Sequence, residues 1–178
     1  MSNIDWEFIH KLEGKGHTKG YHPTNNSGVT IASGFDLKEK DADFCRSIGI
    51  PETIVSELLP YFGLYGDQAK HFAEKLELTE DAVEIIDRCS RSYYAENLIS
   101  QYNSYDPIQE FDNLDQGQAT VIISVGFQYG SFSRTPSFIK YATDGDWDAV
   151  YQELQNFGDY FPTRRKKEAE YLKNYGSI

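Results

Sequence analysis

The longest continuous helix signal in the chain covers about residues 79–102. Its apolar residues recur at helical spacing, and Thr79 stands where a side-chain hydroxyl caps a first turn. The apolar positions include Val83, Ile86, Tyr93 and Leu98. A helix of this length is unusual in a compact domain.

A short first helix is predicted over residues 4–12, where apolar side chains share one face, acidic residues stand near the start, and Gly14 ends the run. Over residues 15–34 the pattern changes to Gly, Asn, Ser and Pro. Residues 25–28 are able to supply positive φ angles for a turn, and the apolar run 29–32 follows. This stretch predicts a small β-hairpin or ribbon.

Helix signals continue from Asp36 almost to the end of the chain. Pro51 suits a first helical position. Residues 119–127 are apolar on nearly every side and rich in Val and Ile, so propensity permits either a buried helix or a buried strand. Two amphipathic helices are predicted near the C-terminus, one around residues 147–154 and one that starts at Pro162.

Acidic residues outnumber basic ones, 28 to 17, which gives a net charge of −11. This balance argues against nucleic acid or an anionic membrane as a partner. Cys45 and Cys89 lie in no zinc or redox motif, the four histidines show no ligand spacing, and two buried free thiols are expected. No signal-peptide or membrane-span pattern is found in the sequence, so we expect synthesis in the cytoplasm.

Position singles out two of the many carboxylates. Glu13 falls where the first helix gives way to a glycine-rich turn, and Asp36 follows the predicted hairpin directly. Either side chain is equally consistent with an ordinary surface charge, and spacing alone leaves both interpretations open.

Several motifs, taken in order, resemble those of a known family. Leu12-Glu13-Gly14, a polar loop and the segment 27–36 (SGVTIASGFD) resemble the active-site region of pesticin-like muramidases, toxins of the phage-lysozyme superfamily. The segments 114–130 and 145–148 resemble the central helix of phage-type lysozymes and the start of a following helix. Residues 162–165 resemble their final, arginine-bearing helix, so the resemblance covers nearly the whole chain.

This resemblance implies an α+β, mostly helical, two-lobed lysozyme-like fold in a single domain, residues 1–178. A small lobe with the hairpin would span about residues 1–75, and a helical lobe, including the long connecting helix, about residues 76–178. It also implies that residues 119–127 form a helix and that a cleft lies between the lobes.

The resemblance further implies roles for individual residues. Glu13 would be the general acid, Thr30 would hold the attacking water, and Asp36 would be the second carboxylate, as nucleophile or as activator of a water. Phage lysozymes carry that second acid before the threonine, but residues 14–29 contain no Asp or Glu, which favours Asp36.

Three residues would bind substrate. Phe127 and Gln128 match positions at the cleft wall where sugar binds, and Arg164 matches an arginine that holds the catalytic glutamate. The resemblance implies no metal and no cofactor.

The function implied is hydrolysis of the β-1,4 bond between N-acetylmuramic acid and N-acetylglucosamine in peptidoglycan. The charge of −11 is unfavourable for approach to this anionic polymer. Two alternatives therefore stay open: a non-catalytic glycan-binding module, and a hydrolase of uncharged chitin-like glycans.

Such a protein would act in the periplasm or cell wall of a target cell, as a bacteriocin domain, a type VI secretion effector or a phage endolysin. Delivery would need a secretion system, a pore or a larger parent polypeptide. Its expected partners are peptidoglycan strands and, for a toxin, a cognate immunity protein that occludes the cleft.

Overall fold

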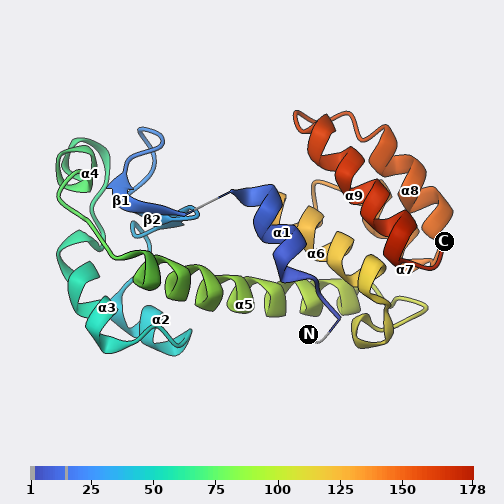
Figure 1. Cartoon of the computed structure of the whole chain (residues 1–178), viewed down its shortest axis with the longest axis horizontal. Helices are drawn as coiled ribbons and strands as arrows, with labels where there is room; N and C mark the ends of the chain where they lie inside the picture. The colour runs from blue at the N-terminus through green and yellow to red at the C-terminus, as the bar shows by residue number, and fades with distance from the viewer. Residues whose placement is uncertain (1–2, 15) are drawn as a thin grey trace. The chain divides into compact units, whose positions relative to one another are not determined.

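The computed structural model describes residues 3–14 and 16–178, and it consists mainly of helices with one three-stranded antiparallel sheet (Figure 1). The mostly helical α+β prediction is confirmed. The chain divides into two compact units, one made of Glu13–Tyr93 and the other of the residues up to Leu12 together with Tyr94–Ile178. The first helix therefore groups with the C-terminal part of the chain, and the division lies later than the boundary expected near residue 75.

The sheet of the first unit contains β1 (His17–Tyr21), β2 (Thr30–Ala32) and β3 (Phe35–Asp36), in the order β1-β2-β3. The predicted hairpin is thus present, with a third short strand added. Residues 25–28, which are able to supply positive φ angles, do not take them. Positive φ occurs instead at Ala32 (55°), the last residue of β2, and at Gly34 (95°), in the turn that follows.

Helices α2 (Ala42–Ser47), α3 (Glu52–Leu58) and α4 (Gly66–Ala73), with the 3-10 turn η1 (Leu59–Tyr61), complete this unit. Pro51 is the N-cap of α3 rather than its first helical residue. The core is formed by apolar residues of the sheet and these helices together with the N-terminal part of α5, including Val29, Ile31, Leu37, Val55, Leu58, Val83 and Ile86.

Helix α5 (Glu80–Ser104) is the long helix that the sequence predicts, and at 25 residues it is about 37 Å long. The Thr79 hydroxyl accepts a hydrogen bond from the Ala82 backbone N–H at 3.2 Å, which confirms the predicted cap. The division between the two units falls within this helix, between Tyr93 and Tyr94.

The second unit is built on α6 (Gln116–Tyr129), in which every residue from Gly117 to Gly126 is buried. Propensity leaves this segment open between strand and helix, but its ends favour the helix. Asp115 and Gln118 form a reciprocal capping box at the start, and Gly130, at φ 71°, ends the helix in the left-handed conformation.

Among the described residues this unit has four further helices: α1 (Trp6–Glu13), except for its last residue, α7 (Pro136–Thr143), α8 (Trp147–Gln155) and α9 (Pro162–Tyr175), with a 3-10 turn η2 (Phe111–Asn113). Figure 1 shows α9 beside α6. Rings of Phe8 on α1 and Tyr171 on α9 stack 4.1 Å apart. Among the described residues, no helix has the length and apolar character needed to span a membrane.

Candidate active site

The sheet brings together two of the three residues expected to carry the chemistry. Thr30 opens β2 and Asp36 closes β3, and the two are direct cross-strand partners. Directly opposed residues of antiparallel strands project from the same face, with Cβ atoms about 4.5–5.5 Å apart. A hydroxyl and a carboxylate therefore stand side by side on one face of the sheet.

The Asp36 carboxylate is held by backbone donors on two sides. Its Oδ1 accepts hydrogen bonds from the N–H groups of Gly28, at 3.0 Å, and Lys38, at 2.8 Å. The Gly28 N–H also lies 3.2 Å from Oδ2. Because both strong contacts use Oδ1, the half-buried carboxylate has a fixed orientation.

Glycine is required at position 28 for space rather than for its backbone angle. A Cβ there would lie 2.7 Å from Asp36 Oδ1 and 2.7 Å from the Lys38 backbone nitrogen. The loop before β2 thus packs directly on Asp36. The neighbouring Thr30 is buried, and its hydroxyl donates to the Gly28 carbonyl over a long 3.4 Å.

Glu13, the expected general acid, is the last residue of α1 and is exposed. Gly14 follows at φ 83°, a left-handed conformation that favours glycine and ends the helix. Strand β1 begins at His17, four residues after Glu13 in the sequence. The helix therefore ends where the sequence predicts its end, at Gly14.

A further carboxylate, which no sequence pattern predicted, contacts the turn of the sheet. Asp87 on α5 is only 4% exposed, and its two oxygens accept hydrogen bonds from Ser33 in the β2–β3 turn, at 2.9 Å from the backbone N–H and 2.7 Å from the hydroxyl. Tyr21, the partner of Thr30 on β1, has a raised pKa because it is buried and because Asp87 and Asp36 lie near it.

The residues expected to bind sugar lie in the second unit. Phe127 and Gln128 occupy the last turn of α6, and both are half-buried. The Phe127 ring is 6.0 Å from the ring of Trp6 on α1. An aromatic pair of this kind is suited to the apolar face of a sugar, although packing alone also accounts for it.

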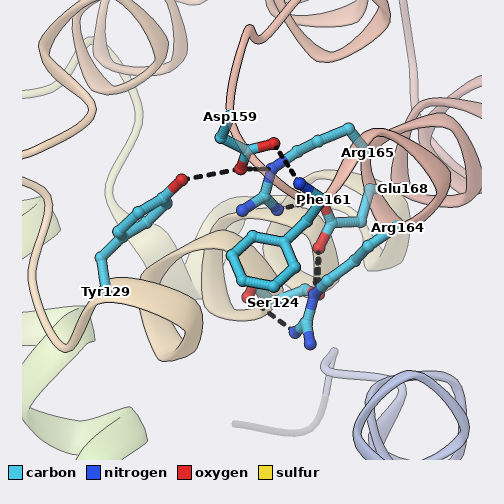
Figure 2. Close-up of polar contacts among 7 residues, drawn as sticks. All are labelled: Ser124, Tyr129, Asp159, Phe161, Arg164, Arg165 and Glu168. Atoms are coloured by element: carbon cyan, nitrogen blue, oxygen red, sulfur yellow. Dashed lines mark hydrogen bonds and ion pairs between the residues drawn. The ribbon is translucent and has the colours of Figure 1, made fainter.

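Arg164, the third such residue, lies in the first turn of α9 and is anchored by two neighbours (Figure 2). Its Nε donates to Glu168 Oε1 at 3.1 Å, and its Nη2 donates to the carbonyl and the hydroxyl of Ser124 at 3.0 and 3.1 Å. Nη1 takes no part in these contacts. The guanidinium group is thereby fixed in orientation against α6 and α9.

The same glutamate also holds Arg165, which is 1% exposed. Arg165 Nη1 donates to Glu168 Oε2, and its Nε donates to Asp159 Oδ2 at 2.9 Å. The Tyr129 hydroxyl donates to the same Asp159 oxygen at 2.7 Å, as Figure 2 shows. Two cations and two anions therefore form a balanced, mostly buried network, which no sequence pattern predicted.

The two cysteines are free, as expected, but only Cys45 is buried; Cys89 is half-buried. Burial raises the pKa of the Cys45 thiol to about 11. Within the described part of the chain, no three His, Cys, Asp or Glu side chains gather as a set of metal ligands.

A sheet-bearing unit and a helical unit share a long helix, and a glutamate ends the first helix. The model of the pesticin family, described as "Bacterial toxin homologue of phage lysozyme, C-term", matches residues 3–148. Together with this family match, the arrangement is that of a lysozyme-like protein. The chain therefore belongs to the pesticin family. The match includes Glu13, Thr30, Asp36, Phe127 and Gln128. It ends before α9, so the role of Arg164 rests on the resemblance alone. No curated protein matches the chain.

Proposed function

We propose that the chain is a muramidase that hydrolyses the β-1,4 bond between N-acetylmuramic acid and N-acetylglucosamine in peptidoglycan. The observation that carries the proposal is the cross-strand pair of Thr30 and Asp36 in a member of a family of phage lysozyme homologues. Together with Glu13, these residues supply the two carboxyl groups and the hydroxyl that the reaction needs.

In this mechanism Glu13 protonates the leaving glycosidic oxygen. Asp36 either attacks the sugar carbon that loses this oxygen or activates a water that does so, and Thr30 helps to hold that water. The fixed orientation of Asp36 supports this role, since Oδ1 is engaged by backbone N–H groups while Oδ2 has one longer contact. Oδ2 is the oxygen that we assign to the reaction.

Phe127, Gln128 and Arg164 are proposed to bind the glycan. Phe127 would contact the apolar face of a sugar ring. The anchoring of Arg164 by Glu168 and Ser124 leaves Nη1 for a further acceptor, either a carboxylate of the protein or an oxygen of the substrate. A cation fixed in this way would bind at a lower entropic cost than a mobile one.

The test is mass analysis of the soluble fragments that the wild-type chain and single variants release from purified peptidoglycan. Glu13→Gln and Asp36→Asn are expected to abolish release. Asn is suited to position 36, because its side-chain oxygen can accept the same hydrogen bonds from Gly28 and Lys38. Glu39→Gln, which neutralises an exposed carboxylate three residues after Asp36, is the matched control and should retain activity.

Fragments with reducing muramic acid ends from the wild type and the control, lost in both site variants, support the proposal. Release that persists in Glu13→Gln would contradict the role of Glu13. No release by a folded wild-type chain would contradict hydrolysis, and binding of the chain to the insoluble polymer would then support a glycan-binding module.

One observation favours a second candidate, a hydrolase of uncharged chitin-like glycans. The net charge of −11 opposes approach to an anionic polymer but has little effect on a neutral one. Chitin oligomers in the same assay distinguish the two. Faster cleavage of chitin oligomers than of peptidoglycan would favour this candidate.

Because the family description names a bacterial toxin, we propose that the chain acts on the cell wall of a target cell and that a cognate immunity protein binds it. Delivery as a bacteriocin, a type VI effector or an endolysin fits this setting equally well. Cells that express the chain outside their cytoplasm should lyse, and co-expression of a neighbouring gene product that prevents lysis would identify the immunity partner.

A further inference from the structure

The turn between β2 and β3 has an unfavourable backbone conformation. Ala32 takes a φ of 55°, in the left-handed region that residues other than glycine seldom adopt, and Gly34 takes 95°. Ala32 is also fully buried. Such a conformation persists only when the surrounding contacts hold it.

Asp87 supplies those contacts from α5. One carboxylate oxygen accepts from the Ser33 backbone N–H at 2.9 Å, and the other accepts from the Ser33 hydroxyl at 2.7 Å. Both atoms of Ser33 that can donate are therefore bound to a single side chain. Asp87 is 4% exposed, so the carboxylate is shielded from water although Ser33 itself lies at the surface.

The other side of Asp87 is closely packed. A Cβ at Gly16 would lie 2.8 Å from Asp87 Oδ2 and 2.7 Å from Val83 Cγ1, so the backbone before β1 lies directly against the carboxylate. Tyr21 is near as well, since the charge of Asp87 contributes to the raised pKa of its hydroxyl after the larger effect of burial. Asp87 is thus enclosed by the turn, by the start of β1 and by its own helix.

The position of this turn decides which residues face each other across the sheet. The ladder between β2 and β3 has two pairs, Thr30 with Asp36 and Ile31 with Phe35, and the turn follows the second pair at once. On the other side of the first pair, the Leu37 N–H donates to the Val29 carbonyl at 2.9 Å. In a hairpin, the type and length of the turn fix the register of the two strands. A slip by one residue would move Asp36 to the opposite face from Thr30.

We propose that Asp87 is a positioning residue for the hydrolysis, because it clamps the Ala32–Gly34 turn and so keeps Thr30 and Asp36 in register. This inference rests on the proposed function. Asp87 itself need not touch the substrate. Its effect passes through Ser33 to the two strands.

The test compares Asp87→Ala and Asp87→Asn with a control, Glu84→Gln, which removes an exposed charge from α5 one turn earlier. Rates are measured on soluble glycan chains from purified peptidoglycan and divided by the folded fraction from near-ultraviolet circular dichroism. Asp87→Ala should lower kcat about 10- to 100-fold, as a small displacement of reacting groups does, with KM changed less than about twofold. Asp87→Asn should keep kcat within about threefold, since its amide can accept from the Ser33 N–H and donate to the hydroxyl oxygen.

Amide hydrogen exchange provides a readout that does not depend on activity. In Asp87→Ala, exchange should accelerate at Ser33 and along the β2–β3 ladder, while α6 and α9 exchange as in the wild type. A folded Asp87→Ala chain with wild-type kcat, or with unchanged exchange in the ladder, would overturn the inference. A wild type that cleaves no glycan contradicts the proposed function instead, and the exchange experiment still tests the clamp.

Discussion

Replacing Glu168 by Gln should strongly destabilise the helical unit. Its carboxylate is fully buried and accepts hydrogen bonds from three groups: the Ser124 hydroxyl at 2.5 Å, Arg164 Nε at 3.1 Å and Arg165 Nη1. The substitution keeps the shape of the side chain but removes its charge. Asp159 is then the one remaining anion of the network for two guanidinium groups.

The magnitude follows from the burial of Arg165. Breaking a buried ion pair by removing one partner costs about 3–5 kcal/mol, because the remaining charge stays away from water. At 1% exposure, Arg165 has little access to solvent that would offset the loss. A domain of this size has a total stability of about 5–15 kcal/mol, so Glu168→Gln should remove a large part of it.

Urea unfolding followed by circular dichroism measures the loss. The matched control is Glu170→Gln, which neutralises an exposed carboxylate two residues later on the same helix and should change the free energy of unfolding by about 0.5 kcal/mol or less. If Glu168→Gln costs no more than this control, the buried network does not stabilise the unit, and the reasoning is refuted.

Three further predictions concern single positions. Gly28→Ala should cost about 1–3 kcal/mol in urea unfolding and also lower glycan cleavage, because its Cβ would lie 2.7 Å from Asp36 Oδ1. Ellman's reagent at about pH 8 should modify half-buried Cys89 well before Cys45, whose pKa burial raises to about 11; equal rates would contradict this. Burial raises the pKa of Asp159, but hydrogen bonds and a neighbouring arginine outweigh it and hold that pKa below the usual 3.8. The stability it contributes is therefore present above about pH 4 and lost as the pH falls further, so Asp159→Asn should flatten the decline in thermal stability in that range.

Local sequence signals predicted the helices well where they include a clear start. The Thr79 hydroxyl caps α5 as expected, and the C-terminal helices start at Trp147 and Pro162. Over residues 119–127 the apolar pattern was ambiguous, and the capping box at Asp115 explains why a helix forms. Tertiary packing decided the role of Gly28, which is needed for its small size and not for a positive φ.

The candidate site was only partly predictable. The resemblance led to Thr30 and Asp36, and the register of the sheet pairs them. The resemblance gave no indication of Asp87 or Glu168, because burial of a carboxylate depends on contacts with residues distant in sequence. A weak signal existed for both, since apolar residues occur at helical spacing from each acid: Val83 lies four residues before Asp87, and Leu172 lies four residues after Glu168.

Cleavage of purified peptidoglycan in water enriched in heavy oxygen tests the proposed activity most directly. A muramidase breaks the bond between the anomeric carbon of N-acetylmuramic acid and the glycosidic oxygen, and the oxygen of water becomes bound to that carbon. Each new reducing N-acetylmuramic acid end should therefore carry one heavy oxygen atom. Mass spectrometry of the fragments locates that atom. New ends that are reducing N-acetylglucosamine, anhydro-muramic acid ends without the label, or no new ends at all from a folded chain would contradict hydrolysis of this bond.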